Sequence, residues 1–519
     1  MKTPNILEYL ENSRWCNFKN EIKNNNVKKL DFDYIPFDNN NKLFVIGSAE
    51  LSDGNQRFFL MPLAVTKEKP SDEISHLSDG NYYYTDALRE ADFWSSFVKL
   101  IKDNNYKLSF PKGYTIEAQN LGDNNIFDLY ENAPSKPLGV EQSNTTLKIG
   151  NNELAFKLER MLDFAPTINA EYEMNEKLMR EHSQVTPQTY AGLIIRKDNL
   201  QSSSGIVQEF VPNKGDMWNY LQSYLLQKLR ESHLSGLPLK TKDCYELNTL
   251  MAELRNQTIA MGNDLSKPDT NPNFTPETVS LDFIGSYQIA IRGLLHETKQ
   301  TIIENIDKLK EPTLSQTKEL LANWDEQTSE FVQNNINEII LSENKGTINR
   351  VHGDYHLGQV MVTKDNKLKV IDFGGEPSLS MDERKQKYIS VRDIAGMYRS
   401  IKGYLGADTA EKFASTSLVA NSDNTIISPE IYQERKDWAL KTLEPIMDAS
   451  TKTFLGKEHL DPWLKLEILR KNLYEVKYEV ANRPQMAYIP ISGLVDLFDT
   501  PKESTSFTNI KFNDFDKVS

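Results

Sequence analysis

Residues 350–375 contain three oxygen-bearing side chains whose types suit the transfer of a phosphoryl group. The segment reads RVHGDYHLGQVMVTKDNKLKVIDFGG. Asp365 and Asn366 stand between two short apolar runs, a pattern typical of a β-hairpin with a turn at its centre. Because a hairpin brings its two ends together, the side chains of Asp354, Gln359 and Asp372 are predicted to converge.

The spacing of two short motifs in this segment indicates which reaction the three side chains serve. Phosphoryl transfer needs a carboxylate beside the attacking hydroxyl and oxygen ligands for Mg²⁺. Protein kinases supply them with H-R-D-x-x-x-x-N followed by D-F-G. Here H-G-D ends at Asp354, Gln359 follows five residues later, and D-F-G begins at Asp372. Together the motifs favour phosphoryl transfer over a plain hairpin with surface carboxylates.

Length and composition set limits on the class of protein. A chain of 519 residues exceeds what one core usually holds, so two or three domains or lobes are expected. The net charge of −14 argues against a nucleic-acid partner. The N-terminus lacks a secretory apolar core, and no run is long enough to span a bilayer. Cys16 and Cys244 fit a reducing compartment, so a cytoplasmic protein without a membrane partner is expected.

The order of strand-like and helical patterns predicts an α+β, bilobal protein-kinase-like fold. Residues 1–101 are predicted to form an N-terminal cap subdomain with an antiparallel sheet and a helix, in which Phe93, Phe97 and Ile101 mark one helix face. Residues 102–211 are predicted to form the nucleotide-binding N-lobe. Residues 212–519 read as a mostly helical C-lobe with the catalytic loop and a sugar pocket.

Candidate nucleotide-binding residues lie in the predicted N-lobe. Lys157 stands in a strand-like run that precedes a helix, as does the kinase lysine that holds the α- and β-phosphates and pairs with a glutamate of the next helix. We expect Glu173 to be that partner, with Glu171 and Glu176 as alternatives. A lysine in a strand is otherwise most often part of a solvated face.

Further nucleotide contacts are predicted on either side of Lys157. A polar stretch upstream stands where a phosphate-covering loop would be, although it has no glycine-rich pattern. Downstream, main-chain groups at the end of a strand would meet adenine. These two sets comprise Ser143, Asn144 and Thr145, and Gln208, Phe210 and Val211. In the C-lobe, Asp393 is expected to support the backbone of the catalytic loop.

Several ordered segments together resemble the bacterial maltokinase family, which is related to aminoglycoside phosphotransferases and protein kinases. They are GVEQSNTT, FVPNKGDMW, RVHGDYHLGQV, IDFGGEP, RDIAGMYRS and LYEVKYEVANRPQMAYIPISGL, and they are spread over most of the chain. The resemblance implies transfer of the ATP γ-phosphate to the anomeric hydroxyl of maltose. The product, maltose 1-phosphate, would enter α-glucan (glycogen) synthesis, with a functional link to trehalose synthase and maltosyltransferase.

The resemblance also implies roles for individual residues. Asp354 would be the base, Gln359 and Asp372 the Mg²⁺ ligands, and Lys157 with Glu173 the clamp on the ATP phosphates. Candidates for the sugar pocket are polar and aromatic, as sugar recognition requires: His352, Glu376, Arg392, Tyr474, Glu475, Tyr478 and Arg483.

Two positions depart from the family pattern. Gly374 replaces an acidic residue, and Met486 replaces an aromatic residue after N-R-P. The second change puts the identity of the sugar in doubt, and a glucosamine kinase of the same family is the nearest rival.

Two other classes of function compete with a sugar kinase. A metallohydrolase could use His352, Asp354 and His356, since His-x-Asp-x-His offers three metal donors. That interpretation leaves D-F-G unexplained. A non-catalytic kinase fold that only binds sugar would be expected to have lost the base or a metal ligand, and neither is missing.

Overall fold

The structure is a computed structural model that describes residues 3–71, 75–122, 124–138, 144–376, 378–416, 428–457 and 460–498. The chain divides into two compact units, Met1–Pro212 and Asn213–Ser519. The predicted lobe boundary, between residues 211 and 212, lies one residue from this division. The further division at residue 101 stays a prediction.

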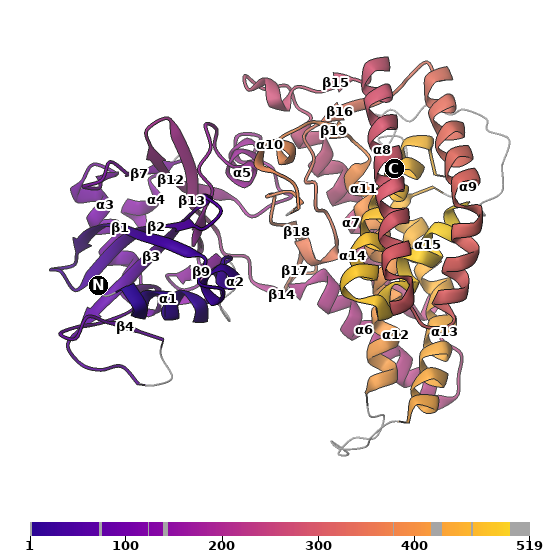
Figure 1. Cartoon of the computed structure of the whole chain (residues 1–519), viewed down its shortest axis with the longest axis horizontal. Coiled ribbons are helices and arrows are strands. Elements are labelled where there is room, and N and C mark those ends of the chain that lie inside the picture. The colour runs from indigo at the N-terminus through magenta and orange to yellow at the C-terminus, as the bar shows by residue number, and fades with distance from the viewer. Residues whose placement is uncertain are drawn as a thin grey trace. The chain divides into compact units, whose positions relative to one another are not determined.

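The first unit begins with a sheet in the order β1-β2-β3-β5-β4, with β11 paired to β3 (Figure 1). Helix α3 packs its apolar face against the sheet, because Phe93, Phe97 and Ile101 recur every four residues and are fully buried. The elements are α1 (Thr3–Asn12), α2 (Lys19–Lys23), β1 (Val27–Phe37), β2 (Lys42–Leu51), β3 (Gln56–Thr66), β4 (Leu77–Ser78), β5 (Tyr83–Asp86), α3 (Phe93–Asp103) and β11 (Met161–Leu162).

A second sheet of the first unit has seven strands in the order β6-β7-β12-β13-β10-β9-β8. Its inward side chains share one hydrophobic core with α3 and the first sheet, so the two sheets form a single body. The elements are β6 (Lys107–Ser109), β7 (Thr115–Asn120), α4 (Ile126–Leu129), β8 (Ser135–Pro137), β9 (Asn144–Ile149), β10 (Leu154–Glu159), α5 (Ala170–Arg180), β12 (Thr189–Lys197) and β13 (Leu200–Glu209).

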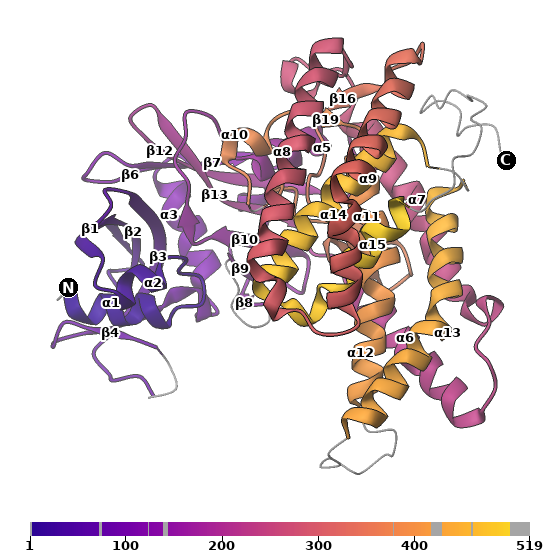
Figure 2. The ribbon, with the colours of Figure 1, turned by 45° about the vertical axis from the view of Figure 1, so that its right-hand side comes forward.

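The second unit is mainly helical. Helices α8, α9, α14 and α15 share an apolar core and run alongside one another (Figure 2). The long helices are α6 (Met217–Ser235), α7 (Tyr245–Leu265), α8 (Leu281–Asn305), α9 (Thr313–Leu341), α13 (Pro429–Leu455) and α14 (Pro462–Asn482). Shorter ones are α10 (Met381–Arg384), α11 (Arg392–Tyr398), α12 (Gly406–Ser415) and α15 (Tyr488–Phe498), with a π-helical segment, Arg399–Leu405, between α11 and α12.

Two small sheets complete the second unit. One has the order β14-β17-β18 and carries the predicted hairpin; the other has the order β15-β16-β19. Their strands are β14 (Asn213–Asp216), β15 (Glu277–Thr278), β16 (Thr347–Asn349), β17 (Val360–Thr363), β18 (Leu368–Val370) and β19 (Tyr388–Ile389). The α+β class is confirmed. In the part of the chain that the structure describes, no helix is both long and apolar enough to cross a membrane.

Candidate active site

The predicted hairpin is present and holds the two motifs at its open end. Strands β17 and β18 pair antiparallel, with Val360 opposite Val370. Asn366 lies in the turn with a φ of 62°, a left-handed conformation that asparagine tolerates. The inward side chains of both strands are buried, which fixes the register. The sequence pattern therefore predicted the local fold correctly.

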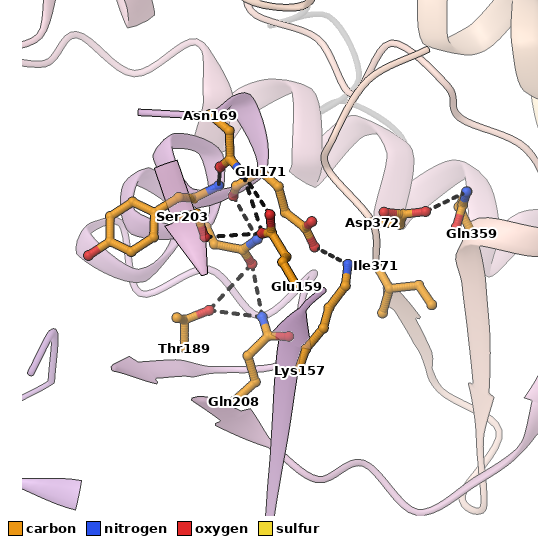
Figure 3. Close-up of polar contacts among 12 residues, drawn as sticks. Lys157, Glu159, Asn169, Glu171, Thr189, Ser203, Gln208, Gln359, Ile371 and Asp372 are labelled. Carbon is orange, nitrogen blue, oxygen red and sulfur yellow. Dashed lines mark hydrogen bonds and ion pairs between the residues drawn. The ribbon is translucent and has the colours of Figure 1, made fainter. Parts of the chain in front are cut away.

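Gln359 and Asp372 meet at the open end of the hairpin, as predicted. The Gln359 amide donates from Nε2 to Asp372 Oδ2 at 3.1 Å (Figure 3). Gln359 ends a 3₁₀ turn, Leu357–Gln359, that leads directly into β17. Asp372 has a φ of 65°, so the chain turns sharply as it leaves β18. An amide and a carboxylate thus lie side by side on a rigid hairpin.

Asp354 lies between two basic side chains. Lys471 Nζ is 3.6 Å from Asp354 Oδ1, and His356 Nε2 is 3.8 Å from Oδ2. His356 Nδ1 accepts a hydrogen bond from the Gly358 N–H at 3.1 Å. Burial lowers the pKa of His356, so the ring is neutral at pH 7 and its proton is on Nε2, facing Asp354.

Helix α11 and the π-helical segment after it hold the loop that carries Asp354. Asp393 accepts hydrogen bonds from the N–H groups of His352 at 2.8 Å and Gly353 at 2.9 Å, which confirms the predicted support role. About one helical turn after Asp393, Gly396 packs directly against the loop, since a Cβ at this position would lie only 2.7 Å from the Tyr355 carbonyl oxygen. Ser400 Oγ then accepts from the Leu357 N–H at 3.2 Å. Burial raises the pKa of Asp393, so its carboxylate depends on these donors.

The His352 side chain is enclosed between the H-G-D and D-F-G motifs and is not open to a sugar pocket. Its side chain is 1% exposed, and Nε2 donates to the Ile371 carbonyl at 2.9 Å. Its ring packs on Phe373, with ring centroids 4.8 Å apart. The prediction that His352 belongs to the sugar pocket is therefore wrong for this structure, because the ring is enclosed between the two strand ends.

In the first unit, Lys157 forms an ion pair with Glu171, one of the two alternatives to Glu173 that the sequence offered. Lys157 Nζ lies 2.5 Å from Glu171 Oε1 (Figure 3). The helix begins at its N-cap, Asn169, whose side chain accepts from the Tyr172 N–H at 2.9 Å. Glu171 and Glu173 differ by about 200° around the helix axis, so the two side chains leave the helix in different directions. The structure supports the alternative Glu171 as a partner of Lys157, and the role of Glu173 stays a prediction.

A second carboxylate, Glu159, lies beside this pair on the same strand. Ser203 Oγ donates to it at 3.0 Å and Asn169 Nδ2 at 3.3 Å. Burial and the nearby charge of Glu171 raise the pKa of Glu159 to about 8. Glu159 is therefore mostly protonated at pH 7, which leaves Glu171 as the charged partner of Lys157.

The predicted phosphate-covering residues, 143–145, lie before and at the start of strand β9. Ser143 lies outside the described residues, and Asn144 begins β9. Thr145 lies within β9 and is buried, and its hydroxyl is 3.4 Å from Arg160 Nη1. Its side chain therefore cannot cover a phosphate, since alternate strand residues point into the core.

Residues 208–211 are placed at the end of β13. The Gln208 side chain donates to Asn175 Oδ1 and Thr189 Oγ1, each at 2.9 Å. The Phe210 N–H donates to the Glu153 carbonyl at 3.0 Å. Val211 is buried. An adenine ring at this segment would therefore have to use main-chain groups other than the Phe210 N–H.

Glu376 and Arg392, two predicted sugar-pocket residues, are buried beside Arg470, whose side chain is partly exposed. Glu376 Oε2 is 3.8 Å from Arg392 Nη2 and 3.9 Å from Arg470 Nη1, distances too long for hydrogen bonds. Arg392 Nε is also buried without a hydrogen-bond partner in the described part of the chain. Buried polar groups that keep unused hydrogen-bonding capacity suit a polar ligand.

Helix α14 carries the other sugar-pocket candidates. Lys471, Tyr474 and Tyr478 follow helical spacing on one face, and Lys471 Nζ lies 5.2 Å from the Tyr474 ring centre. Glu475 follows Lys471 by four residues, and its Oε2 is bound by Arg399 Nε and Nη2, each at 2.8 Å. Arg483 is similarly bound to Glu479 at 2.5 Å. Glu475 and Arg483 are therefore committed to ion pairs within the protein. The rings of Tyr474 and Tyr478 lie beside the cations of Lys471 and Arg483, at 5.2 Å and 5.3 Å.

The donor set at the hairpin fits a magnesium ion. Gln359 would offer its amide oxygen and Asp372 a carboxylate, and Mg²⁺ commonly takes one or two protein oxygens and completes its shell with phosphates and water. Within the described ranges no three His, Cys, Asp or Glu side chains form a metal-binding group. The metallohydrolase interpretation, which needs such a group from His352, Asp354 and His356, therefore lacks its ligands.

Lys471 is the site residue that sequence reasoning missed. Its ammonium group approaches Asp354, although the two residues are more than a hundred positions apart. The available signal was its position three residues before Tyr474, on the helix face already assigned to the sugar.

The chain is similar to glucosamine kinases in part of its sequence and in its fold. No protein-family model matches the chain. A glucosamine kinase of Streptacidiphilus jiangxiensis is 26% identical over 152 residues, which cover 28% of this chain and 31% of that protein. Among solved structures, a glucosamine kinase in complex with glucosamine, ADP and inorganic phosphate aligns with a TM-score of 0.55. That alignment has 16% identity and covers 91% of this chain and 94% of the other.

A second glucosamine kinase structure, crystal form A, agrees, with a TM-score of 0.53, 16% identity, and coverage of 88% of this chain and 89% of that one. The chain has a bilobal kinase-like fold. At this level of identity the structural likeness concerns the fold, and the sequence match spans less than a third of its relative.

Proposed function

We propose that this chain is an ATP-dependent sugar kinase, a phosphotransferase with an alcohol group as acceptor. The arrangement that supports this most is the open end of the hairpin, where Gln359 and Asp372 are in contact and the loop bearing Asp354 is fixed by Asp393. Phosphoryl transfer depends mainly on positioning and on electrostatic stabilisation, and this arrangement supplies both.

In the proposed reaction the sugar hydroxyl gives its proton to the Asp354 carboxylate. The hydroxyl oxygen forms a bond to the γ-phosphorus of ATP, the bond to the β–γ bridging oxygen breaks, and ADP leaves. Mg²⁺ held by Gln359 and Asp372 would neutralise charge on the phosphates, and Lys157, oriented by Glu171, would do the same at the α- and β-phosphates.

Maltose is the proposed acceptor, with maltose 1-phosphate as product and a place in α-glucan synthesis beside trehalose synthase and maltosyltransferase. This choice follows from the resemblance of the motifs to maltokinases. Glucosamine is the second candidate, because the sequence match and the structural neighbours carry that name. Tyr474, Tyr478, Glu376 and Arg392 are the residues we assign to the acceptor pocket.

The test is turnover of Mg-ATP with maltose, glucosamine and glucose, using the wild type and Asp354→Asn. We expect phosphorylation of one sugar and a loss of rate of about 10² or more in the variant. Sugar-independent hydrolysis of ATP, or equal rates for wild type and Asp354→Asn, would refute the proposal. Tight sugar binding without turnover would instead support a non-catalytic sugar-binding fold.

A further inference from the structure

A groove in the first unit is separate from the residues assigned to phosphoryl transfer. It has a volume of about 380 Å³, a size common for small-molecule sites. Its lining comes from β1, β2 and β3, from the start of β7, from the segment after β11 and from the β12–β13 turn. Neither Lys157 nor Glu171 lines it.

The register of the paired strands determines which side chains form the floor of the groove. In the neighbouring strands β1, β2 and β3 (Figure 1), Asp31 pairs with Ser48 and Ser48 with Phe58. In the next row, Lys29 pairs with Glu50. Paired residues of adjacent strands point to the same face of a sheet, so these side chains rise together into the groove.

Three aromatic rings form an apolar wall. Phe58 and Phe164 pack edge to face with centroids 5.0 Å apart, and the Tyr114 ring lies 5.9 Å from Phe164. All three line the groove. Lys197 Nζ covers the Tyr114 ring at 4.2 Å. The rings hold one another in place, so the wall exists before any ligand arrives.

Polar groups of both signs surround this wall. Lys29, Glu50, Gln56 and Asp198 line the groove, and their side chains form no hydrogen bond or ion pair with other described residues. Asp31, by contrast, is paired with Lys112. The groove therefore presents free donors and free acceptors next to an aromatic surface, without a dominant charge.

We propose that this groove binds an uncharged carbohydrate of one or two sugar rings. Sugar hydroxyls both donate and accept hydrogen bonds, so they can satisfy Lys29 and Glu50 together, and the apolar face of a sugar ring can lie on the aromatic wall. A phosphorylated ligand would meet the carboxylates of Glu50 and Asp198. A wholly apolar ligand would leave the charged groups desolvated and unpaired.

The test distinguishes sugar binding in this groove from binding at the acceptor site, because it measures protection separately for the peptides that line the groove. Hydrogen–deuterium exchange of the full chain is measured without ATP, with maltose, glucose, glucosamine or glucose 6-phosphate. We expect maltose or glucose to protect peptides of β1, β2 and the β12–β13 turn, and expect weaker protection by the two charged sugars. Equal or stronger protection by a charged sugar, or none by the neutral ones, would overturn the proposal.

Variants then assign the binding energy to the groove. The double variant Lys29→Ala/Glu50→Ala changes only exposed side chains and should raise the dissociation constant of the protected site by about tenfold, equivalent to about 1.4 kcal/mol. Lys28→Ala, exposed on the same strand but outside the lining, is the matched control and should leave it unchanged. Unchanged affinity in the double variant would contradict the assignment.

Kinase activity gives an independent reading. The double variant should keep the wild-type kcat at saturating acceptor, because its residues are not part of the phosphoryl-transfer machinery. Since the binding experiment needs no ATP, protection of the groove in a chain that phosphorylates no sugar would refute only the proposed function. Sugar phosphorylation without protection of the groove would refute only this inference.

Discussion

Replacing Glu171 by glutamine tests the nucleotide-binding side of the proposal, because the structure pairs Lys157 with Glu171, whereas the sequence favoured Glu173 and gave Glu171 as an alternative. The substitution keeps the shape of the side chain and removes its charge. Lys157 and Glu171 have side-chain exposures of 22% and 12%, so the pair is largely but not fully shielded from water. Without the carboxylate, the ammonium group loses an ion-pair partner that helps to hold it in place.

The expected loss in kcat/KM for ATP follows from this partial burial of the ion pair. Exposed ion pairs contribute about 0–1 kcal/mol, while breaking a fully buried pair costs about 3–5 kcal/mol. An intermediate value of about 1–3 kcal/mol is reasonable here. Since about 1.4 kcal/mol corresponds to a factor of ten, kcat/KM for ATP should fall between about 5-fold and 150-fold.

The assay is steady-state kinetics with ATP as the varied substrate and the acceptor held at saturation. Glu176→Gln is the matched control, because Glu176 lies on the same helix and, among the described residues, forms an ion pair only with Arg180, at 3.4 Å. We expect the control to retain nearly full kcat/KM. If Glu171→Gln is as active as the control while Glu173→Gln loses activity, the pairing seen in the structure does not operate in catalysis.

Three further predictions concern the catalytic loop and the titration of buried groups. Gly396→Ala should lower kcat and the melting temperature, because the new methyl group would push against the Tyr355 carbonyl; thermal unfolding and kinetics test this. Lys471→Met should reduce kcat by about tenfold without altering stability, since it removes the cation nearest Asp354; kinetics and melting curves separate the two effects. Glu159→Gln should remove a pH dependence of the free energy of unfolding. Because the native pKa of Glu159 is raised to about 8, the wild type should lose stability as the pH rises from about 4.5 to 8, by up to about 1.4 kcal/mol per pH unit. Denaturant unfolding at several pH values measures this loss in the wild type and its absence in the variant.

The hairpin could be predicted from sequence because its determinants are local. The Asp365–Asn366 turn, the flanking apolar residues and the two motifs lie within a short segment, and nothing distant is needed to bring Gln359 to Asp372. The Asp393 contact was also predictable, since a carboxylate at a helix start readily accepts hydrogen bonds from a nearby loop. The α+β class followed from the same kind of local pattern.

Which glutamate pairs with Lys157 depends on the rotation of α5 about its own axis, and the sequence alone does not determine that rotation. Two glutamates separated by two positions lie on different sides of a helix, and which one faces the strand depends on how the helix packs. Here Tyr172 inserts against the sheet where Gly192 leaves room, and its hydroxyl donates to Gln119 at 2.9 Å. That tertiary contact sets the rotation of α5 and turns Glu171 toward Lys157.

The sugar-pocket candidates show a related limit, because polar residue types do not reveal whether their bonds are already used. Glu475 and Arg483 fit a sugar site by type, yet each is bound to a charged partner in the protein. Burial of His352 could not be seen from H-G-D alone, since it depends on Phe373 and Ile371 closing over the ring. The contact of Lys471 with Asp354 joins distant segments and needed the fold.

The surroundings of Asp354 suit a base that must accept a proton from an incoming hydroxyl. Lys471 and His356 lie 3.6 Å and 3.8 Å from its two oxygens, which is close enough for attraction but too long for hydrogen bonds. Within the described chain the carboxylate accepts no hydrogen bond, while its loop is held by Asp393. A carboxylate bound by several donors would be fixed but occupied. Here the backbone is anchored and the oxygens stay open, so the group is both positioned and free to react.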